Sequence, residues 1–144
     1  MINQAMLIGN LGANPEQRKA SNGSALTNFS LATSSRWKDA DGQMKEETEW
    51  HRIVTFGRLA EICGQYLTKG SKVYIEGRLQ TNKWTNPDGN IKYTTQVVAK
   101  EMKMLDSRSA NNNETGIVSD TSSSNNTNLP PDPFMGEVPF KDQF

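Results

Sequence analysis

The sequence predicts an all-β fold: a five-stranded barrel with one helix between the third and fourth strands, followed by a disordered C-terminal tail. Three observations predict it. Apolar and polar residues alternate with a period of two in several stretches before residue 105. One stretch among them, residues 58–70, changes to the helical period. The composition then changes near residue 106, after which apolar residues are rare.

The first two strands are expected near the N-terminus. AMLIGNL, residues 5–11, is a short apolar run that stops before a glycine and a proline. In ALTNFSLATSSRWK, residues 25–38, Phe29 and Leu31 alternate with polar residues. This alternation predicts a strand with one face toward a core.

A turn at DADG, residues 39–42, is expected to lead into a third strand that runs from about Met44 to Phe56. Neither side of this strand is a clean core. One side carries Trp50, Arg52, Val54 and Phe56, and the other carries His51, Ile53 and Thr55. An arginine between two aromatic residues suggests that the first side binds a ligand.

The helix is expected in RLAEICGQYLTKG, with Lys69 and Gly70 closing it. Its apolar residues recur at helical spacing and form one stripe: Leu59, Ile62, Cys63, Tyr66 and Leu67. We interpret the single cysteine, Cys63, as a packing residue on this stripe.

Two further strands follow the helix. In VYIEGRLQTNKW, residues 73–84, we expect Val73, Ile75 and Leu79 to point inward, while Tyr74, Glu76, Arg78 and Gln80 point outward. NPDG, residues 86–89, turns the chain into the fifth strand, IKYTTQVVA. Three strands, a helix and two strands in about 100 residues fit an OB-fold barrel, whose sheet face and loops bind oligonucleotides or oligosaccharides.

The charge distribution separates the barrel from the tail. Residues 1–105 carry 14 basic and 10 acidic side chains, a net charge of +4, whereas residues 106–144 carry a net charge of −4. The tail is rich in Asn, Ser and Pro and buries too little apolar surface to offset the entropy of ordering it. We therefore expect a barrel domain at 1–106, a disordered linker at 107–133 and an apolar tip at 134–144.

The three tryptophans are the strongest functional signal. Trp84 has the parity of the polar face, Trp37 lies beyond the core pair of its strand, and each tryptophan has a cationic neighbour. The neighbours are Arg36 and Lys38 for Trp37, Arg52 for Trp50 and Lys83 for Trp84. Single-stranded nucleic acid is the ligand that uses this combination, because bases stack on aromatic rings while Lys and Arg follow the phosphates.

Other chemistry has little support in the sequence. His51 has no second His or Cys nearby, which argues against a metal site, and the glutamates at 46, 47 and 49 fit a solvated hairpin. No apolar run approaches the length of a signal sequence or a membrane span. We expect a cytoplasmic protein that is no enzyme and needs neither a metal nor a cofactor.

Several long motifs resemble the bacterial single-stranded DNA-binding protein family, and the resemblance covers residues 1–105. They are IGNLGANPE (8–16), TEWHRIVTFGRLAE (48–61) and LTKGSKVYIEGRLQTNKWT (67–85). The resemblance implies base stacking by Trp37, Trp50, Phe56 and Trp84, and phosphate contacts by Arg52, Arg58, Lys69 and Lys83. Gln80 and Asn82 depart from the family, because close relatives often have arginines there.

The resemblance also implies a homotetramer that binds and protects single-stranded DNA, without sequence preference, during replication, recombination and repair. Family members recruit replication and repair proteins through an acidic tail that ends in Pro-Phe. This chain departs from that pattern, because Pro139-Phe140 is followed by four residues that end in Phe144. Either Pro139-Phe140 docks internally or Phe144 supplies both ring and carboxylate; we favour the second alternative, because the carboxylate adds a charge-assisted contact.

Two other classes of function remain open from the residues alone. One is an OB-fold protein that binds tRNA or an oligosaccharide, although such a ligand would not need so many aromatic residues. The other is an interaction protein whose barrel only carries the tail. Deleting residues 107–144 would separate the second class, because a DNA-binding barrel would keep its affinity.

Overall fold

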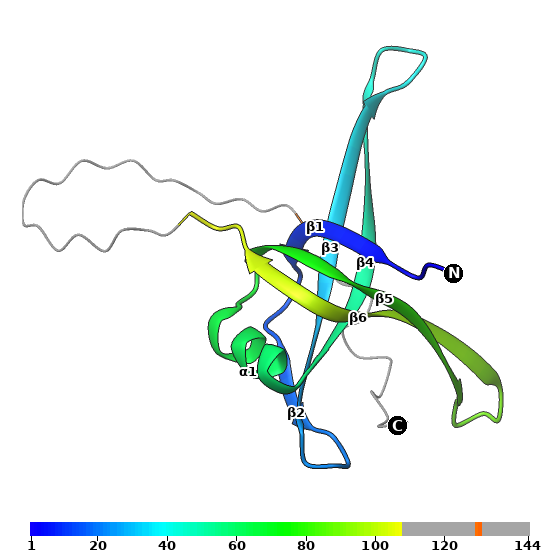
Figure 1. Cartoon of the computed structure of the whole chain (residues 1–144). Helices are drawn as coiled ribbons and strands as arrows, with labels where there is room; N and C mark the ends of the chain where they lie inside the picture. Colours follow the sequence, from blue (N-terminus) through cyan, green and yellow to red (C-terminus); the bar gives the residue numbers. More distant parts are fainter. Residues whose placement is uncertain (108–128, 131–144) are drawn as a thin grey trace, which may run out of the picture.

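The computed structural model describes residues 1–107 and 129–130, and the first of these segments forms a barrel with two long hairpins (Figure 1). The elements are β1 (Ala5–Leu11), β2 (Glu16–Lys19), β3 (Ala25–Lys38), β4 (Met44–Phe56), α1 (Gly57–Tyr66), β5 (Lys72–Thr85) and β6 (Ile91–Met104). The expected linker at 107–133 and tip at 134–144, with Pro139, Phe140 and Phe144, lie outside the described residues except for Ser107, Leu129 and Pro130.

The sheet closes on itself through five strands. Its order is β1-β5-β6-β4-β3, and β1 returns to pair with β3 at Leu11 and Leu31. All pairings are antiparallel except that of β4 with β6, which is parallel at Ile53–Val97 and Val54–Val98. This confirms the predicted five-stranded barrel with a helix between its third and fourth strands, because α1 joins β4 to β5.

The barrel interior holds one apolar cluster. Its members are Leu11, Phe29, Leu31, Ile53, Cys63, Leu67, Val73, Ile75 and Val97. Phe29 and Leu31 therefore occupy the core, as their alternation predicts. Removing side chains of this size from water stabilises a fold by about 1.5–3 kcal/mol each. The strands of the barrel thus have one face that is committed to packing.

The structure corrects three details of the expected elements. A short strand, β2, pairs with β3 along the barrel edge, and its four residues are all exposed. The helix ends at Tyr66, before Lys69 and Gly70, and Leu67 caps it through a bond from its N–H to the carbonyl of Cys63. Tyr66, the last residue of the helix, has an exposed side chain, whereas the expectation placed it on the buried stripe.

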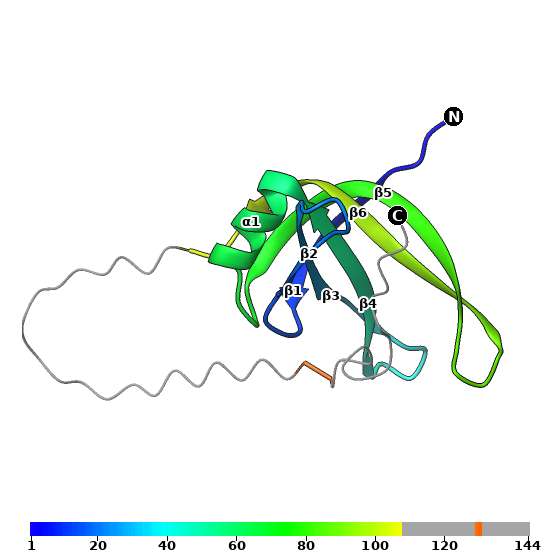
Figure 2. The same ribbon diagram turned by 90° about the horizontal axis from the view of Figure 1, so that it is seen from below.

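The expectation that Leu79 points into the core is also wrong. Leu79 has the parity of Ile75, but it is 48% exposed. The reason is that β1 pairs with β5 only as far as Gly77, so that β5 and β6 continue beyond the barrel as a two-stranded hairpin. The hairpin of β3 and β4 also projects beyond the barrel, in a different direction, and it ends in the loop drawn in cyan (Figures 1 and 2). We call these projections the β3–β4 arm and the β5–β6 arm.

Candidate nucleic-acid interface

The side of the barrel wall that points away from the core cluster brings several predicted residues together. Directly paired residues share a face of a sheet. The register pairs Leu26 with Phe56, Asn28 with Val54, Ser30 with Arg52 and Ala32 with Trp50. The same face continues through Val98 and Gln96 of β6 to Arg78, Gln80, Asn82 and Trp84 of β5. We call this surface the outer face.

Trp50 is held on the outer face by contact with a backbone turn. The tryptophan is half-buried. A Cβ atom added to Gly12 would lie 2.3 Å from Cζ3 of Trp50 and 2.7 Å from its Cη2. Such distances are far below van der Waals contact, so only glycine leaves room for the ring at this point. The turn after β1 therefore fixes the edge of the Trp50 ring.

Arg52 lies two residues further along β4 and is 5% exposed. Its Cα partner across the strands is Ser30, which is also buried. A buried guanidinium adds positive charge to the surface above it more strongly than a solvated one, because the surrounding dielectric constant is lower. Arg52 is therefore part of the barrel wall between Trp50 and Phe56. A cation at the surface of the barrel would instead be exposed to solvent.

Trp84 occupies the outer face of the β5–β6 arm. Its indole Nε1–H donates a hydrogen bond of 2.8 Å to Oγ1 of Thr94 on the facing strand. This bond orients the ring against the arm. Lys92 is the register partner of Trp84 and is exposed, so that a cation lies directly across from the ring. The sequence analysis missed Lys92, although the turn at 86–89 already implies this register.

Trp37 lies on the opposite face from Trp50. The register pairs Ala32 with Trp50 and Trp37 with Lys45, and because Trp37 is five positions, an odd number, beyond Ala32 on the same strand, it lies on the other face. The Trp37 side chain is 46% exposed on the β3–β4 arm. The cation beside it is therefore Lys45, and the sequence neighbours Arg36 and Lys38 point away from it.

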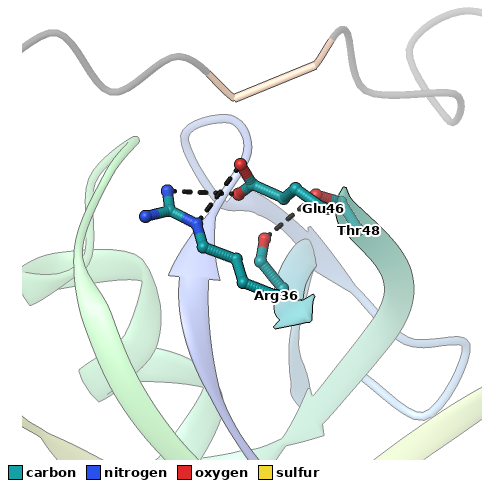
Figure 3. A network of polar contacts seen from close by, with 4 residues as sticks. Arg36, Glu46 and Thr48 are labelled. Carbon is teal, nitrogen blue, oxygen red and sulfur yellow. Dashed lines mark hydrogen bonds and ion pairs between the residues drawn. The ribbon is translucent and has the colours of Figure 1, made fainter. Parts of the chain in front are cut away.

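Arg36 has an acidic partner on its own face. Its Nε lies 3.3 Å from Oε2 of Glu46, the residue directly across the arm (Figure 3). On the same face, nearer the barrel, the hydroxyl groups of Ser34 and Thr48 are 3.0 Å apart. Exposed pairs of this kind contribute about 0–1 kcal/mol, so a phosphate could displace Glu46 at small cost.

The remaining predicted cations do not gather at the tryptophans. Lys83 points to the face opposite Trp84, where its register partner is the exposed Tyr93. Arg58, at the start of α1, is exposed and lies 3.2 Å from Oε2 of Glu61. Lys69 is exposed beyond the end of α1, and its backbone N–H donates to Oδ1 of Asn14. The cations are thus distributed around the barrel and its arms.

Sequence analysis also missed Tyr93. It is the most exposed aromatic residue among the described part of the chain, with 68% of its surface accessible. The pairing of Lys83 with Tyr93 repeats, on the other face of the arm, the combination of aromatic ring and cation found at Trp84 and Lys92. Counting residues outward from the turn at 86–89 would have revealed this pair as well.

His51 is on the core side of β4, across from Leu31. Its Nε2 lies 2.8 Å from Oγ1 of Thr33, and burial lowers the pKa of the imidazole, with Glu49 acting weakly in the opposite direction. Within residues 1–107 and 129–130, no group of three His, Cys, Asp or Glu side chains could hold a metal ion. None of the described helices is long and apolar enough to cross a membrane.

Comparison with known proteins identifies relatives of this chain. The model of the single-strand binding protein family matches residues 2–105. Single-stranded DNA-binding protein 1 of Chlorobaculum tepidum is 50% identical over 126 residues, which make up 87% of this chain and 75% of that protein. The sequence similarity therefore extends through the barrel and beyond it.

Two solved structures share the architecture. The Plasmodium falciparum SSB in complex with ssDNA superposes with a TM-score of 0.69 at 33% identity, covering 74% of this chain and 97% of that one. A deletion mutant of the single-stranded DNA binding protein from Thermus aquaticus superposes with a TM-score of 0.65 at 36% identity, covering 74% of this chain and 52% of that one.

Proposed function

The chain belongs to the single-strand binding protein family, whose members bind DNA without catalysing a reaction, and from this premise we propose how it binds and what it serves. It binds single-stranded DNA without sequence preference, by stacking bases on aromatic rings and by contacts between phosphates and Lys or Arg side chains. In this role it protects single strands during replication, recombination and repair, and it works in the cytoplasm at the nucleoid.

One observation carries the proposal: Trp50, Arg52 and Phe56 lie along β4 on the outer face, with Val54 between Arg52 and Phe56, and this face continues to Trp84. Aromatic residues in series with a cation between them match a flexible strand, whose bases turn outward one after another. Stacking on each ring contributes about 1–3 kcal/mol for any base, which accounts for binding without sequence preference. A duplex hides its base faces, so that this surface selects single strands.

We assign the phosphate contacts to Arg52, Arg58, Lys69 and Lys83, and the fourth stacking ring to Trp37. Because these residues lie on several sides of the barrel and on both arms, a single strand that reaches them all must curve around the body. Such a path is longer than one sheet face. The spread of the cations thus supports a wrapped strand.

We further propose that the chain is a homotetramer. Met6 and Ile8 on the outward side of β1 are 63% and 56% exposed, and Tyr74 lies beside Ile8 in the register. Apolar residues that gather on one exposed sheet surface mark an interaction site. A tetramer would also multiply the length of DNA that one particle binds, since one OB barrel covers only ~4–16 nucleotides.

We also propose that residues 134–144 are a tip that binds partner proteins. The linker at 107–133 joins this tip to the barrel domain at 1–106. We assign Pro139, Phe140 and Phe144 to this tip, and we favour recognition of Phe144 over docking of Pro139-Phe140. Deleting Phe144 should then weaken binding to replication and repair proteins more than Phe140→Ala does. A larger loss from Phe140→Ala would favour internal docking.

A competition experiment tests the central part of the proposal. The protein is bound to labelled oligo-dT and then challenged with unlabelled oligo-dT, duplex DNA, tRNA or an oligosaccharide. We expect displacement by oligo-dT at the lowest concentration and weak displacement by the others. Displacement by tRNA or an oligosaccharide at lower concentrations than oligo-dT would contradict the proposal and favour the other class of OB-fold protein.

A further inference from the structure

Asn28 carries a buried side-chain amide on β3. It is 2% exposed and lies near the N-terminal end of β3. Neither Nδ2 nor Oδ1 has a hydrogen-bond partner among the described residues. A buried carboxamide without partners destabilises the folded chain, because its atoms lose their bonds to water and gain nothing in return. Such a group calls for an explanation outside the stability of the barrel.

The position of Asn28 points to the nucleic-acid interface. It lies on the outer face, directly across from Val54, and Val54 lies between Arg52 and Phe56 on β4. Diagonal neighbours on paired strands are about 7–8 Å apart, within reach of long and aromatic side chains. The side chains of Phe56 and Arg52 are therefore long enough to reach the region of the amide.

The hydrogen-bonding groups of the amide limit the kinds of ligand that could satisfy it. Nδ2 offers two donors and Oδ1 accepts, so that a ligand must present an acceptor and a donor side by side to satisfy both atoms. A phosphate has acceptors only and would leave Oδ1 without a partner. The Watson–Crick edge of every base presents an adjacent donor and acceptor, and it is open in a single strand. Rotation of the amide by 180° would match either order of the two groups.

We propose that Asn28 hydrogen-bonds the edge of a base that stacks on Phe56 in the complex with single-stranded DNA. This inference rests on the proposed function and adds to it a residue that contacts base edges. Because both polar atoms are covered in the free chain, neighbouring side chains must turn aside when the base arrives. The amide thus gains its partners only in the complex, and its cost in the free chain is offset there.

The test compares Asn28→Leu with Asn10→Leu. Leucine keeps the branched shape of asparagine and removes both polar atoms. Nδ2 of Asn10 donates to the carbonyl oxygen of Gly70 at 3.1 Å, so its amide has a structural partner and serves as the control. Without DNA, Asn10→Leu should lower the Tm, whereas Asn28→Leu should leave the Tm unchanged or raise it.

Binding is measured with oligo-dT and with an oligonucleotide of N3-methylthymine, which lacks the donor of the base edge. We expect Asn28→Leu to bind oligo-dT about threefold to tenfold more weakly than the unmodified protein, the effect of one or two hydrogen bonds. This difference should largely disappear on N3-methylthymine. Asn10→Leu should bind oligo-dT as tightly as the unmodified protein.

Three results would overturn the inference. Equal affinity of Asn28→Leu and the unmodified protein for oligo-dT would assign the amide to another ligand, such as a peptide, or to none. A loss that persists in full on N3-methylthymine would place the contact on the sugar or phosphate. A Tm loss in both Asn28→Leu and Asn28→Ala, as large as that in Asn10→Leu, would make Asn28 structural. If the unmodified protein itself failed to bind oligo-dT, the proposed function would fall instead.

Discussion

At the scale of single residues, the proposed binding of single-stranded DNA depends on aromatic rings that are already held in place in the free protein. Trp50 rests against Gly12, and the indole of Trp84 is bonded to Thr94. A ring that is already oriented loses little conformational entropy when a base stacks on it, so that more of the stacking free energy appears as affinity. Exposed Trp37 and Tyr93 have no side-chain hydrogen bond of this kind to any described residue.

Substitution of single aromatic residues should therefore weaken DNA binding by the energy of one stacked base. We expect Trp50→Ala and Phe56→Ala each to reduce the affinity for oligo-dT by about 1–3 kcal/mol. Equilibrium titration by fluorescence anisotropy of a labelled oligonucleotide measures the change. Tyr66→Ala is the matched control, because Tyr66 is an exposed aromatic on α1, outside the outer face. Unchanged affinity in both Trp50→Ala and Phe56→Ala would show that base stacking on these rings does not contribute to binding.

Cys63 gives a prediction about stability and pH. The thiol is fully buried, and burial raises its pKa from 9.0 to about 11, although a hydrogen bond with Thr55 acts in the opposite direction. A raised pKa in the folded state means that the unfolded chain loses its proton first as the pH rises. The contribution of this group to stability is therefore complete below pH 9 and is lost as the pH rises through about 11.

Urea denaturation at pH 8 and at pH 10.5 measures this effect. Lys and Tyr side chains also titrate in this range, so that the comparison is with Cys63→Ala at both values. We expect the unmodified protein to lose more stability between the two values than the variant does. Equal losses would show that Cys63 does not titrate with a raised pKa. In the native protein at pH 8, the buried thiol should also resist thiol reagents until the chain unfolds.

At the scale of elements, the two arms extend the interface beyond the barrel. Lys83 and Tyr93 share one face of the β5–β6 arm, while Trp84 and Lys92 share the other. Both faces thus combine a cation with an aromatic ring. A strand that follows the arm can use either face, and one that wraps around the arm can use both.

Removal of one phosphate contact on this arm should change the salt dependence of binding. For single strands, log K falls with log salt concentration by about 0.7 for each phosphate contact. We expect Lys83→Ala to flatten the slope by about that amount without creating a preference among bases, and Lys103→Ala to leave the slope unchanged. Lys103 is a suitable control because it is paired with Glu101 at 3.2 Å and lies opposite Tyr74, away from the arm. A slope for Lys83→Ala equal to that of the unmodified protein would remove Lys83 from the DNA path.

The elements also show how far the sequence alone could predict the fold. The long strands and the helix could be predicted because apolar periodicity is a local signal. Strand β2 could not, because EQRK has no apolar residue and becomes a strand only by pairing with β3. The exposure of Leu79 follows from where β1 stops pairing with β5, which no local pattern reveals.

The candidate site, too, could be predicted from the sequence only in part. Trp50, Arg52 and Phe56 could be grouped from one strand, because their spacing of two fixes a common face. The pairing of each tryptophan with its sequence neighbour was misleading, since adjacent residues in a strand point to opposite faces. Arg36 and Lys83 therefore turn away from Trp37 and Trp84. The buried amide of Asn28 could be identified only from the structure, because the sequence does not show whether a side chain is buried or has a hydrogen-bond partner.

At the scale of the whole molecule, the exposed apolar surface on β1 predicts assembly. Light scattering at micromolar concentration should report about four chains per particle. We expect Ile8→Glu to shift the mass toward smaller species, because a charge on this surface opposes its removal from water. Ile91→Glu is the control, since Ile91 is similarly exposed but lies at the tip of the β5–β6 arm. A monomer that binds oligo-dT tightly would contradict the tetramer.

The measurement that tests the central claim most directly is the intrinsic fluorescence of the protein during titration with oligo-dT. The chain has three tryptophans, and all three are assigned here as stacking rings. We predict that saturation with oligo-dT quenches most of the emission, and that the same concentration of duplex DNA leaves it nearly unchanged. Binding of oligo-dT without quenching, or equal quenching by the duplex, would contradict recognition of single strands by base stacking.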